Sequence, residues 1–151
     1  MRENITLYGG IYGLSDEAIE KRTAELVDRL DLRDDVDTRV KSIPLGWKQK
    51  LAFSVAVLHD PKVVFLDEPT SGVDPIVRRQ FWELIYEAAH GGTTVFVTTH
   101  YMDEAEYCDR VSIMVDGRIV ALGTPSELKA QYDARTIDDL FVRLARAGNA
   151  A

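Results

Sequence analysis

The sequence predicts an α/β fold in which two parallel strands are joined by a helix. Two short runs rich in β-formers, Val63–Leu66 and Thr93–Thr98, flank a helical pattern that begins at Pro75. A strand, a helix and a second strand in this order form a right-handed crossover, so we expect the strands to be parallel. Val63–Leu66 is continuously apolar and bounded by Pro61 and Pro69, which predicts a strand buried on both faces.

Three helices are expected before the first strand. The first covers Met1–Tyr12, and Ser15 is placed to cap the second. A charged loop, Arg33–Lys41, leads to the third helix, which should end near Asp60–Pro61 because the residue before a proline disfavours helix. Apolar residues at helical spacing mark the inner faces: Ile19, Leu26, Val27 and Leu30 in the second helix, and Leu51, Ala52, Val55 and Leu58 in the third.

The chain after the first strand divides at clear local signals. Asp74–Pro75 opens the connecting helix, whose inner face should hold Ile76, Phe81, Leu84 and Ile85, and Gly91–Gly92 ends it. A short helix near Asp103–Tyr107 follows the second strand. Asp116–Gly117 then predicts a hairpin between strands at 111–115 and 119–122. Thr124–Glu127 predicts a capping box, and the last helix should cover about Ile137–Ala145.

Composition limits the classes of function. The 151 residues are 46% hydrophobic and carry a net charge of −7, which argues against a nucleic-acid coat protein. The longest apolar run, Leu51–Leu58, is interrupted by a serine and is far shorter than the about 20 residues of a membrane-spanning helix. The single cysteine, Cys108, excludes an internal disulfide and is expected to be a small buried thiol in a reducing compartment. We expect His59 and His90 to be surface residues.

Polar side chains close both central strands. Asp67 and Glu68 follow the first strand, and the second leads to His100. Because the carboxyl ends of parallel strands meet at one edge of a sheet, where ligands bind in such folds, these three residues should converge. Side chains alternate along a strand, so the two carboxylates should point in different directions. One can serve a hard cation and the other can orient a water molecule.

The run from Phe65 to Pro75, Phe-Leu-Asp-Glu-Pro-Thr-Ser-Gly-Val-Asp-Pro, resembles the Walker B strand and D-loop of ABC-type ATPases. The resemblance implies that Asp67 holds Mg²⁺ through its water shell and that Glu68 polarises the water attacking ATP. It also implies that His100 is the switch histidine, which contacts the γ-phosphate. Ser71, Gly72 and Asp74 would belong to the D-loop at a dimer seam, and Asp74 would also cap the next helix.

The segment Ile43–Lys50 stands where this family has its signature motif, and it departs from the usual Leu-Ser-Gly-Gly-Gln. Pro44 replaces the serine and Leu45 the first glycine, whereas Gly46 and a polar Lys-Gln-Lys run remain. The resemblance implies that the Gly46 N–H and the helix N-terminus cap the phosphate bound to the opposite protomer. For Trp47 we favour packing within the helical subdomain, with nucleotide contact as the alternative.

The C-terminal part supports the same family. Val111–Thr124 resembles its closing hairpin, and Thr136–Val142 resembles the tail helix of drug-export members. The expected organisation is a helical subdomain with the signature-like loop over residues 1–60, half of a catalytic core over 61–123, and C-terminal helices and tail over 124–151. The implied fold is a partial P-loop NTPase fold without the phosphate-binding Walker A loop.

The resemblance implies an ATP-binding and ATP-hydrolysing subunit of an export transporter, using ATP and Mg²⁺. Its partners would be a second ATPase protomer and a membrane permease, with no nucleic acid and no direct membrane insertion. It would lie in the cytoplasm at the inner face of the cell membrane. The alternative is a non-catalytic half-domain that pairs with a complete subunit. DNA-repair relatives are disfavoured because the chain has no heptad run.

No Gly-x-x-x-x-Gly-Lys-Ser/Thr pattern occurs, and the cluster Gly9, Gly10 and Gly13 is interpreted as a helix break. We therefore hypothesise an internal start or a split gene. An incomplete sheet should leave an unpaired edge and exposed apolar surface, which predicts poor stability or aggregation of the isolated chain. The isolated chain should also show negligible ATP hydrolysis.

Overall fold

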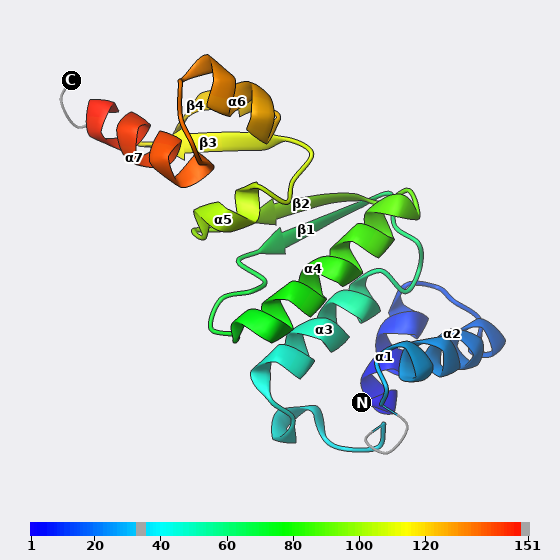
Figure 1. Ribbon diagram of the computed structural model, residues 1–151. Coiled ribbons are helices and arrows are strands. Elements are labelled where there is room, and N and C mark those ends of the chain that lie inside the picture. Colours follow the sequence, from blue (N-terminus) through cyan, green and yellow to red (C-terminus); the bar gives the residue numbers. More distant parts are fainter. Residues whose placement is uncertain (33–35, 149–151) are drawn as a thin grey trace. The chain divides into compact units, whose positions relative to one another are not determined.

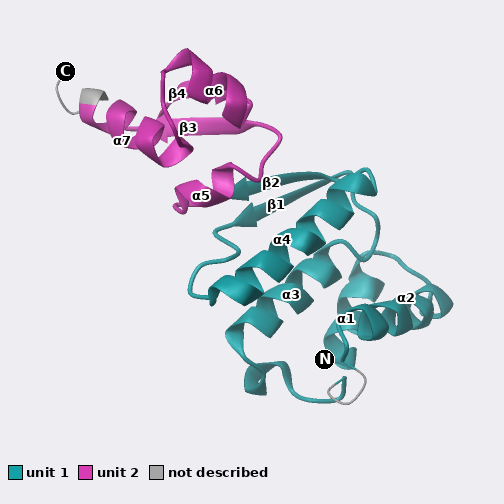
Figure 2. Ribbon diagram, in the orientation of Figure 1, with its two compact units in different colours: residues 1–98 teal, residues 99–151 magenta. Residues whose placement is uncertain are grey.

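The computed structural model describes residues 1–32 and 36–148, so part of the loop expected at 33–41 lies outside the described residues. The chain forms two compact units, residues 1–98 and 99–151 (Figure 2). The three-part division expected from the sequence stays a prediction. Each unit has its own helices and strands (Figure 1).

The first unit opens with a helical layer. It contains α1 (Arg2–Ile11), α2 (Asp16–Arg29), a 3₁₀ turn (Val40–Ser42) and α3 (Leu45–Ala56). The Ser15 hydroxyl accepts the N–H of Ala18, which confirms its capping role. Gly9 lies inside α1, where an added Cβ would be 2.7 Å from Ile19 of α2, so it serves close helix packing and is not a helix break. Gly13, with φ 79°, follows the end of α1.

The βαβ unit is confirmed. Strand β1 (Val63–Asp67), helix α4 (Pro75–His90) and strand β2 (Thr94–Thr98) follow in order, and the two strands are parallel in a two-stranded sheet. Helix α4 packs on β2 and on α3, where the rings of Phe53 and Phe81 lie 5.5 Å apart. Figure 1 shows α3 and α4 on the same side of the strand pair.

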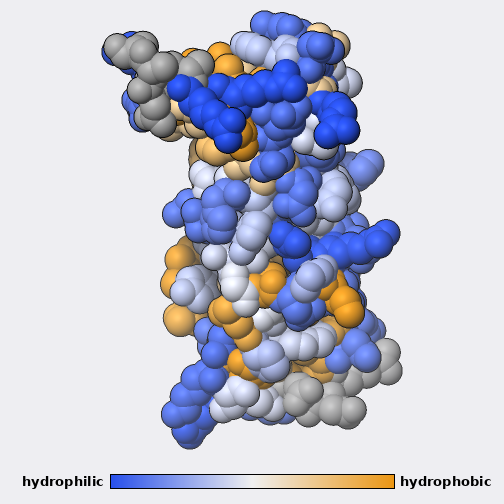
Figure 3. Space-filling model, turned by 60° about the vertical axis from the view of Figure 1, so that its left-hand side comes forward, coloured by the Kyte–Doolittle hydropathy of each residue, from blue (hydrophilic) through white to orange (hydrophobic). Residues whose placement is uncertain are grey.

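The expectation that β1 is buried on both faces is wrong. Val64 is buried, whereas Val63 is 44% and Phe65 is 77% exposed. Because α4 packs on one face of the strand pair, the alternating side chains of the other face remain open. There the rings of Phe65 and Phe96 stack at 5.2 Å. This agrees with the expected exposed apolar surface, and Figure 3 shows groups of hydrophobic residues open to solvent.

Four smaller expectations for this unit are corrected. Helix α3 ends at Ala56, because the chain turns before Asp60, which has φ 51°. Ala52 and Ile76 are exposed and do not belong to the inner faces of their helices. His59 is only partly exposed, because its ring stacks 4.0 Å from that of Tyr12 and its Nδ1 is buried. His90 is exposed, as expected.

The second unit surrounds a small core. It contains α5 (Met102–Ala105), β3 (Val111–Val115), β4 (Arg118–Gly123), α6 (Pro125–Gln131) and α7 (Ile137–Gly148). Strands β3 and β4 are antiparallel, and both turn residues have positive φ, which confirms the hairpin. The capping box of α6 is also present. The buried apolar residues of this core are Ala105, Ile113, Ala121, Leu128, Ile137 and Leu140.

Candidate functional site

The carboxyl ends of β1 and β2 carry the first part of the candidate site. Asp67 and Thr98 are register partners in the parallel pair. The Thr98 hydroxyl donates to Oδ1 of Asp67 at 2.5 Å and accepts the N–H of Glu68 at 3.1 Å. Glu68 has φ 43°, a conformation uncommon outside glycine, so the backbone turns away from the strand directly after Asp67. Both carboxylates are exposed.

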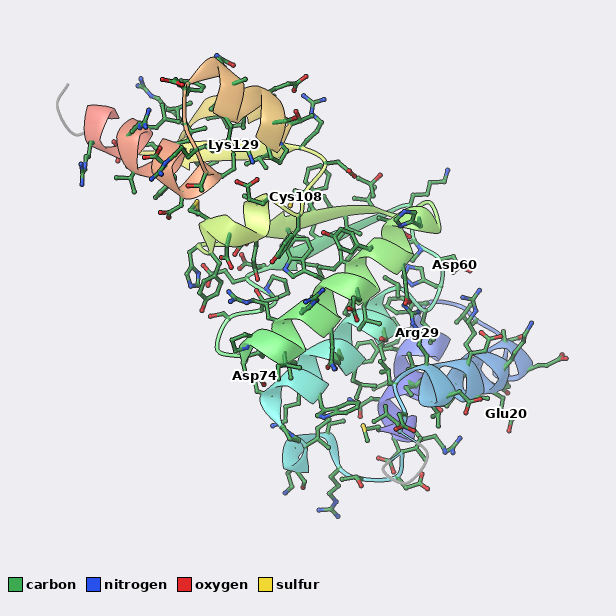
Figure 4. All side chains as sticks on the ribbon, viewed as in Figure 1. Glu20, Arg29, Asp60, Asp74, Cys108 and Lys129 are labelled. Carbon is green, nitrogen blue, oxygen red and sulfur yellow. The ribbon has the colours of Figure 1, made fainter. Side chains whose placement is uncertain are left out.

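The loop after β1 is fixed by its own hydrogen bonds. The N–H of Ser71 donates to the carbonyl of Glu68, and Gly72 adopts φ 75°. The loop ends at Asp74, whose carboxylate accepts the N–H groups of Ile76 and Val77 at 3.0 Å each. Asp74 is therefore the N-cap of α4, as expected, and lies at the start of that helix (Figure 4).

The start of α3 lies against this loop and against α4. Gly46 is buried there, and a Cβ added to it would be 2.4 Å from Cγ1 of Val77. The Gln49 side chain donates to the carbonyl of Ser71 at 3.3 Å. The fold thus brings the signature-like segment and the D-loop-like segment together within one unit.

Trp47 is half-buried, and the ammonium of Lys50 lies 4.8 Å from its ring centroid. Lys50 is itself buried and donates to the side-chain oxygen of Gln80 on α4. Burial lowers the pKa of Lys50 because it disfavours the charged ammonium, whereas Asp74 and Glu83 act in the opposite direction. These contacts favour the packing interpretation of Trp47.

His100 follows Thr98 by two positions and belongs to the second unit. Its side chain is exposed, and its ring lies 4.2 Å from that of Tyr101. Within this unit it lines a cavity of about 520 Å³ together with Glu106 and Ile137. The parallel order of β1 and β2 agrees with the expected common edge, and the convergence of His100 with Asp67 and Glu68 stays a prediction.

Three further residues belong to this site and were not predicted as site residues: Thr98, Gln49 and Lys50. Thr98 was recognisable in principle, because aligning the carboxyl ends of two parallel strands places the last residue of β2 opposite Asp67. The roles of Gln49 and Lys50 depend on how α3 meets α4, and no local pattern encodes that contact.

The oxygen atoms at this edge suit a magnesium ion held mainly through water. The Asp67 carboxylate and the Thr98 hydroxyl are adjacent hard donors. Among residues 1–32 and 36–148, no three histidine, cysteine or acidic side chains gather as a cluster that would hold a metal ion directly. An ion that keeps most of its water shell needs few protein ligands, so Asp67 fits it.

Comparison with known proteins adds three kinds of similarity. Residues 10–102 match a family model described as "AAA domain, putative AbiEii toxin, Type IV TA system". The chain is 44% identical over 149 residues to the probable multidrug ABC transporter ATP-binding protein YbhF of Escherichia coli, covering 95% of this chain and 26% of that protein. It is 36% identical to the daunorubicin resistance ATP-binding protein DrrA3 of Streptomyces coeruleorubidus, covering 99% and 48%.

A solved structure described as the ATP-binding subunit of an ABC transporter superposes with a TM-score of 0.81 at 31% identity. The superposition covers 95% of this chain and 61% of that one. The chain thus spans about a quarter of the Escherichia coli relative and about half of the Streptomyces coeruleorubidus relative. Its α/β arrangement, with a parallel strand pair and flanking helices, is the one found in this subunit.

Proposed function

The chain belongs to the ATP-binding proteins of ABC transporters, as part of their nucleotide-binding domain, and from this membership we propose that it supplies the catalytic carboxylates of an ATPase that drives export. The observation that carries the proposal is the parallel register of Asp67 with Thr98, followed by the sharp turn at Glu68. The activity, substrate and partners of the whole protein are part of this proposal, because the chain spans only part of its relatives.

Two adjacent carboxylates have separate tasks in the proposed reaction. Asp67, oriented by the Thr98 hydroxyl, holds the water shell of Mg²⁺. The backbone turns away from β1 at Glu68, and the Glu68 carboxylate orients the water that attacks the γ-phosphate. His100 contacts that phosphate and steadies the water. The bound Mg²⁺ supplies positive charge where negative charge develops on the phosphoryl oxygens.

The second task of the chain is to form the face toward a second protomer. Asp74, Ser71 and Gly72 belong to the loop that follows β1, and the start of α3 lies against it through the Gln49 contact. In the proposed dimer, the first turn of α3, including the Gly46 N–H, approaches the phosphate of the opposite protomer. Trp47 and Lys50 support this turn by packing.

The proposed partner in the membrane is a permease, and the proposed location is the cytoplasmic face of the cell membrane. No helix in the described part of the chain is long and apolar enough to cross a bilayer. The names of two relatives, one multidrug and one daunorubicin resistance, favour export of drug-like molecules. The phosphate-cradling loop would come from a segment other than the present one, so this chain alone should not hydrolyse ATP.

A chimera tests the proposal directly. The 149-residue matching segment of the Escherichia coli relative is replaced by this chain, and MgATP turnover is measured with the purified protein. We expect turnover that falls about 10²–10⁴-fold in Glu68→Gln. Glu20→Gln, an exposed carboxylate on α2, is the matched control and should leave turnover unchanged.

Two outcomes would each contradict one part of this proposal. Turnover that does not depend on Glu68 would favour the second hypothesis, a non-catalytic half that pairs with a complete subunit. ATP hydrolysis by the isolated chain that disappears in Glu68→Gln would refute the expectation that another segment must supply the phosphate cradle.

A further inference from the structure

One threonine hydroxyl organises the backbone on both sides of His100. Oγ1 of Thr99 accepts the N–H of Tyr101 at 3.0 Å, which closes a tight turn with His100 at its centre. The same oxygen donates to Oε2 of Glu104 at 2.6 Å. All four residues lie in the second unit, so the arrangement is defined within one compact body.

Glu104 is the buried end of this network. It has 0% exposure, although it is an acidic residue on the four-residue helix α5. Removing a carboxylate from water costs several kcal/mol unless hydrogen bonds replace the hydration, so a buried glutamate at this position needs donors such as the Thr99 hydroxyl. Its backbone is held too, because its N–H donates to the carbonyl of Tyr101 at 3.0 Å.

Helix α5 is in turn fixed to the rest of its unit. Ala105, next to Glu104, belongs to the buried apolar core, and α5 packs against α7. The carboxylate of Glu106 accepts the N–H of Ile137 at the start of α7 at 3.1 Å. Glu104 is therefore a rigid anchor, whereas the imidazole of His100 is exposed.

We propose that Thr99 and Glu104 are positioning residues that hold the His100 turn in one conformation before nucleotide arrives. The ring of Tyr101, whose N–H closes the turn, lies 4.2 Å from the imidazole and limits its range. A turn that is already ordered loses less conformational entropy when the histidine meets a phosphate. The use of His100 on a phosphate rests on the proposed function, whereas the ordering of the turn is a property of this chain alone.

The first test measures amide hydrogen exchange of Tyr101 by mass spectrometry in dilute solution of the chain. Thr99→Val is nearly isosteric but lacks the hydroxyl, so the Tyr101 amide should exchange about tenfold faster. Thr99→Ser keeps the hydroxyl and should restore slow exchange. Amides of the β3–β4 hairpin serve as the folding control and should not change. Equal exchange in the parent and in Thr99→Val would overturn the proposal.

Variants of Glu104 provide a second, independent test of the proposal. Glu104→Gln retains a carbonyl oxygen that can accept the hydrogen bond of the Thr99 hydroxyl, so hydrogen exchange of the Tyr101 amide should stay slow. Glu104→Leu has a similar volume without an acceptor, so exchange should become faster, as in Thr99→Val. Slow exchange in Glu104→Leu would show that the carboxylate does not hold the turn.

The third arm uses the chimera and asks whether the turn matters for catalysis. Thr99→Val should lower kcat about tenfold with little change in KM, and Thr99→Ser should recover it. Faster exchange of the Tyr101 amide in Thr99→Val with an unchanged kcat would refute a positioning role in catalysis. If the parent chimera shows no turnover, the proposed function fails, while the exchange measurement still decides whether the hydroxyl holds the turn.

Discussion

The hydroxyl of Thr98 lies between the two acidic residues at the end of β1. It donates to the Asp67 carboxylate at 2.5 Å and accepts the N–H of Glu68 at 3.1 Å. One side chain from β2 thereby orients the carboxylate proposed for Mg²⁺ and holds the backbone of the residue proposed to orient water. The geometry of two neighbouring acids thus depends on a strand that lies about thirty residues away in the sequence.

The first prediction concerns this hydroxyl. In the chimera, Thr98→Val should raise the Mg²⁺ concentration needed for half-maximal turnover by about tenfold, because groups that orient a metal-binding carboxylate typically affect affinity to that extent. Thr98→Ser should behave like the parent, since it keeps the donor. The measurement is a Mg²⁺ titration at saturating ATP. An unchanged midpoint in Thr98→Val would show that Asp67 does not need this partner.

The second prediction concerns the contact of α3 with α4. Gly46→Ala places a Cβ 2.4 Å from Cγ1 of Val77, which forces the helices apart. Overpacking of this kind costs about 1–3 kcal/mol, against which the better helix propensity of alanine returns about 1 kcal/mol. We expect a lower free energy of unfolding in urea and partial recovery in the Gly46→Ala, Val77→Ala double variant.

Gly10→Ala is the matched control for that change. Gly10 also lies inside a helix, but a Cβ added to it meets nothing within 4 Å. It should therefore gain about 0.5–1 kcal/mol from the reduced entropy of the unfolded chain. The same sign of effect at both glycines would contradict the steric explanation.

The elements that were predicted correctly depend on short stretches of sequence. Asp116–Gly117 specifies its hairpin and Thr124 with Glu127 specifies its cap, because the interacting groups are a few residues apart. The crossover from β1 to β2 follows from the change in hydrophobic spacing between strand and helix, together with the rule that such crossovers are right-handed.

What could not be predicted depends on which surfaces meet. An apolar run such as Val63–Leu66 is compatible with a strand covered on one face of the sheet or on both. The exposure of Phe65 therefore could not be predicted from it. The stacking of His59 on Tyr12 and the contact of Gly46 with Val77 join segments that are far apart in the sequence. The candidate acids were found because chemistry restricts which residues can follow a strand, whereas Thr98 becomes recognisable only when the carboxyl ends of the two strands are aligned.

The third prediction concerns the open face of β1 and β2. Phe65 and Phe96 stack there, with Phe65 77% exposed. Exposed apolar faces of a small sheet favour association, so the isolated chain should self-associate in sedimentation velocity experiments. Phe65→Lys should reduce association while changing stability by less than about 0.5 kcal/mol.

Ile76→Lys is the control for that experiment, because Ile76 is 73% exposed but lies on α4. It removes a similar apolar area and adds the same charge without changing the sheet face. If Ile76→Lys reduced self-association as much as Phe65→Lys, the effect would come from the added charge. A parent chain that is monomeric in sedimentation velocity would refute the prediction.

The fourth prediction concerns pH. The Arg22 guanidinium donates to both carboxylate oxygens of Asp60, and this hydrogen bonding lowers the pKa of Asp60 below its ordinary 3.8. Above pH 3.8 the carboxylate is ionised in the folded and the unfolded chain, and the pair contributes fully. As the pH falls from 3.8 toward the lower folded pKa, the unfolded chain binds the proton more readily than the folded chain. The contribution to stability is therefore lost progressively, and it is absent below the folded pKa.

Because the Asp60 side chain is 72% exposed, this contribution should be less than about 1 kcal/mol. Asp60→Asn should weaken the loss of stability between pH 6 and pH 3, measured by urea denaturation, and asparagine tolerates the φ of 51° at this position. Asp37→Asn, at the more open contact with Arg2, should retain the parent's dependence. A parent-like profile in Asp60→Asn would contradict this assignment.

The last prediction concerns the thiol of Cys108. Burial raises its pKa from 9.0 to about 11, and the negative charges of Glu104 and Asp109 add to the effect. Since only the thiolate reacts with iodoacetamide, the native chain should be alkylated at pH 8 about 100-fold more slowly than a peptide with an ordinary cysteine. The pH profile separates this cause from simple shielding. A raised pKa requires the rate to keep increasing steeply between pH 9 and pH 10, whereas a shielded thiol of ordinary pKa would level off there at a low rate.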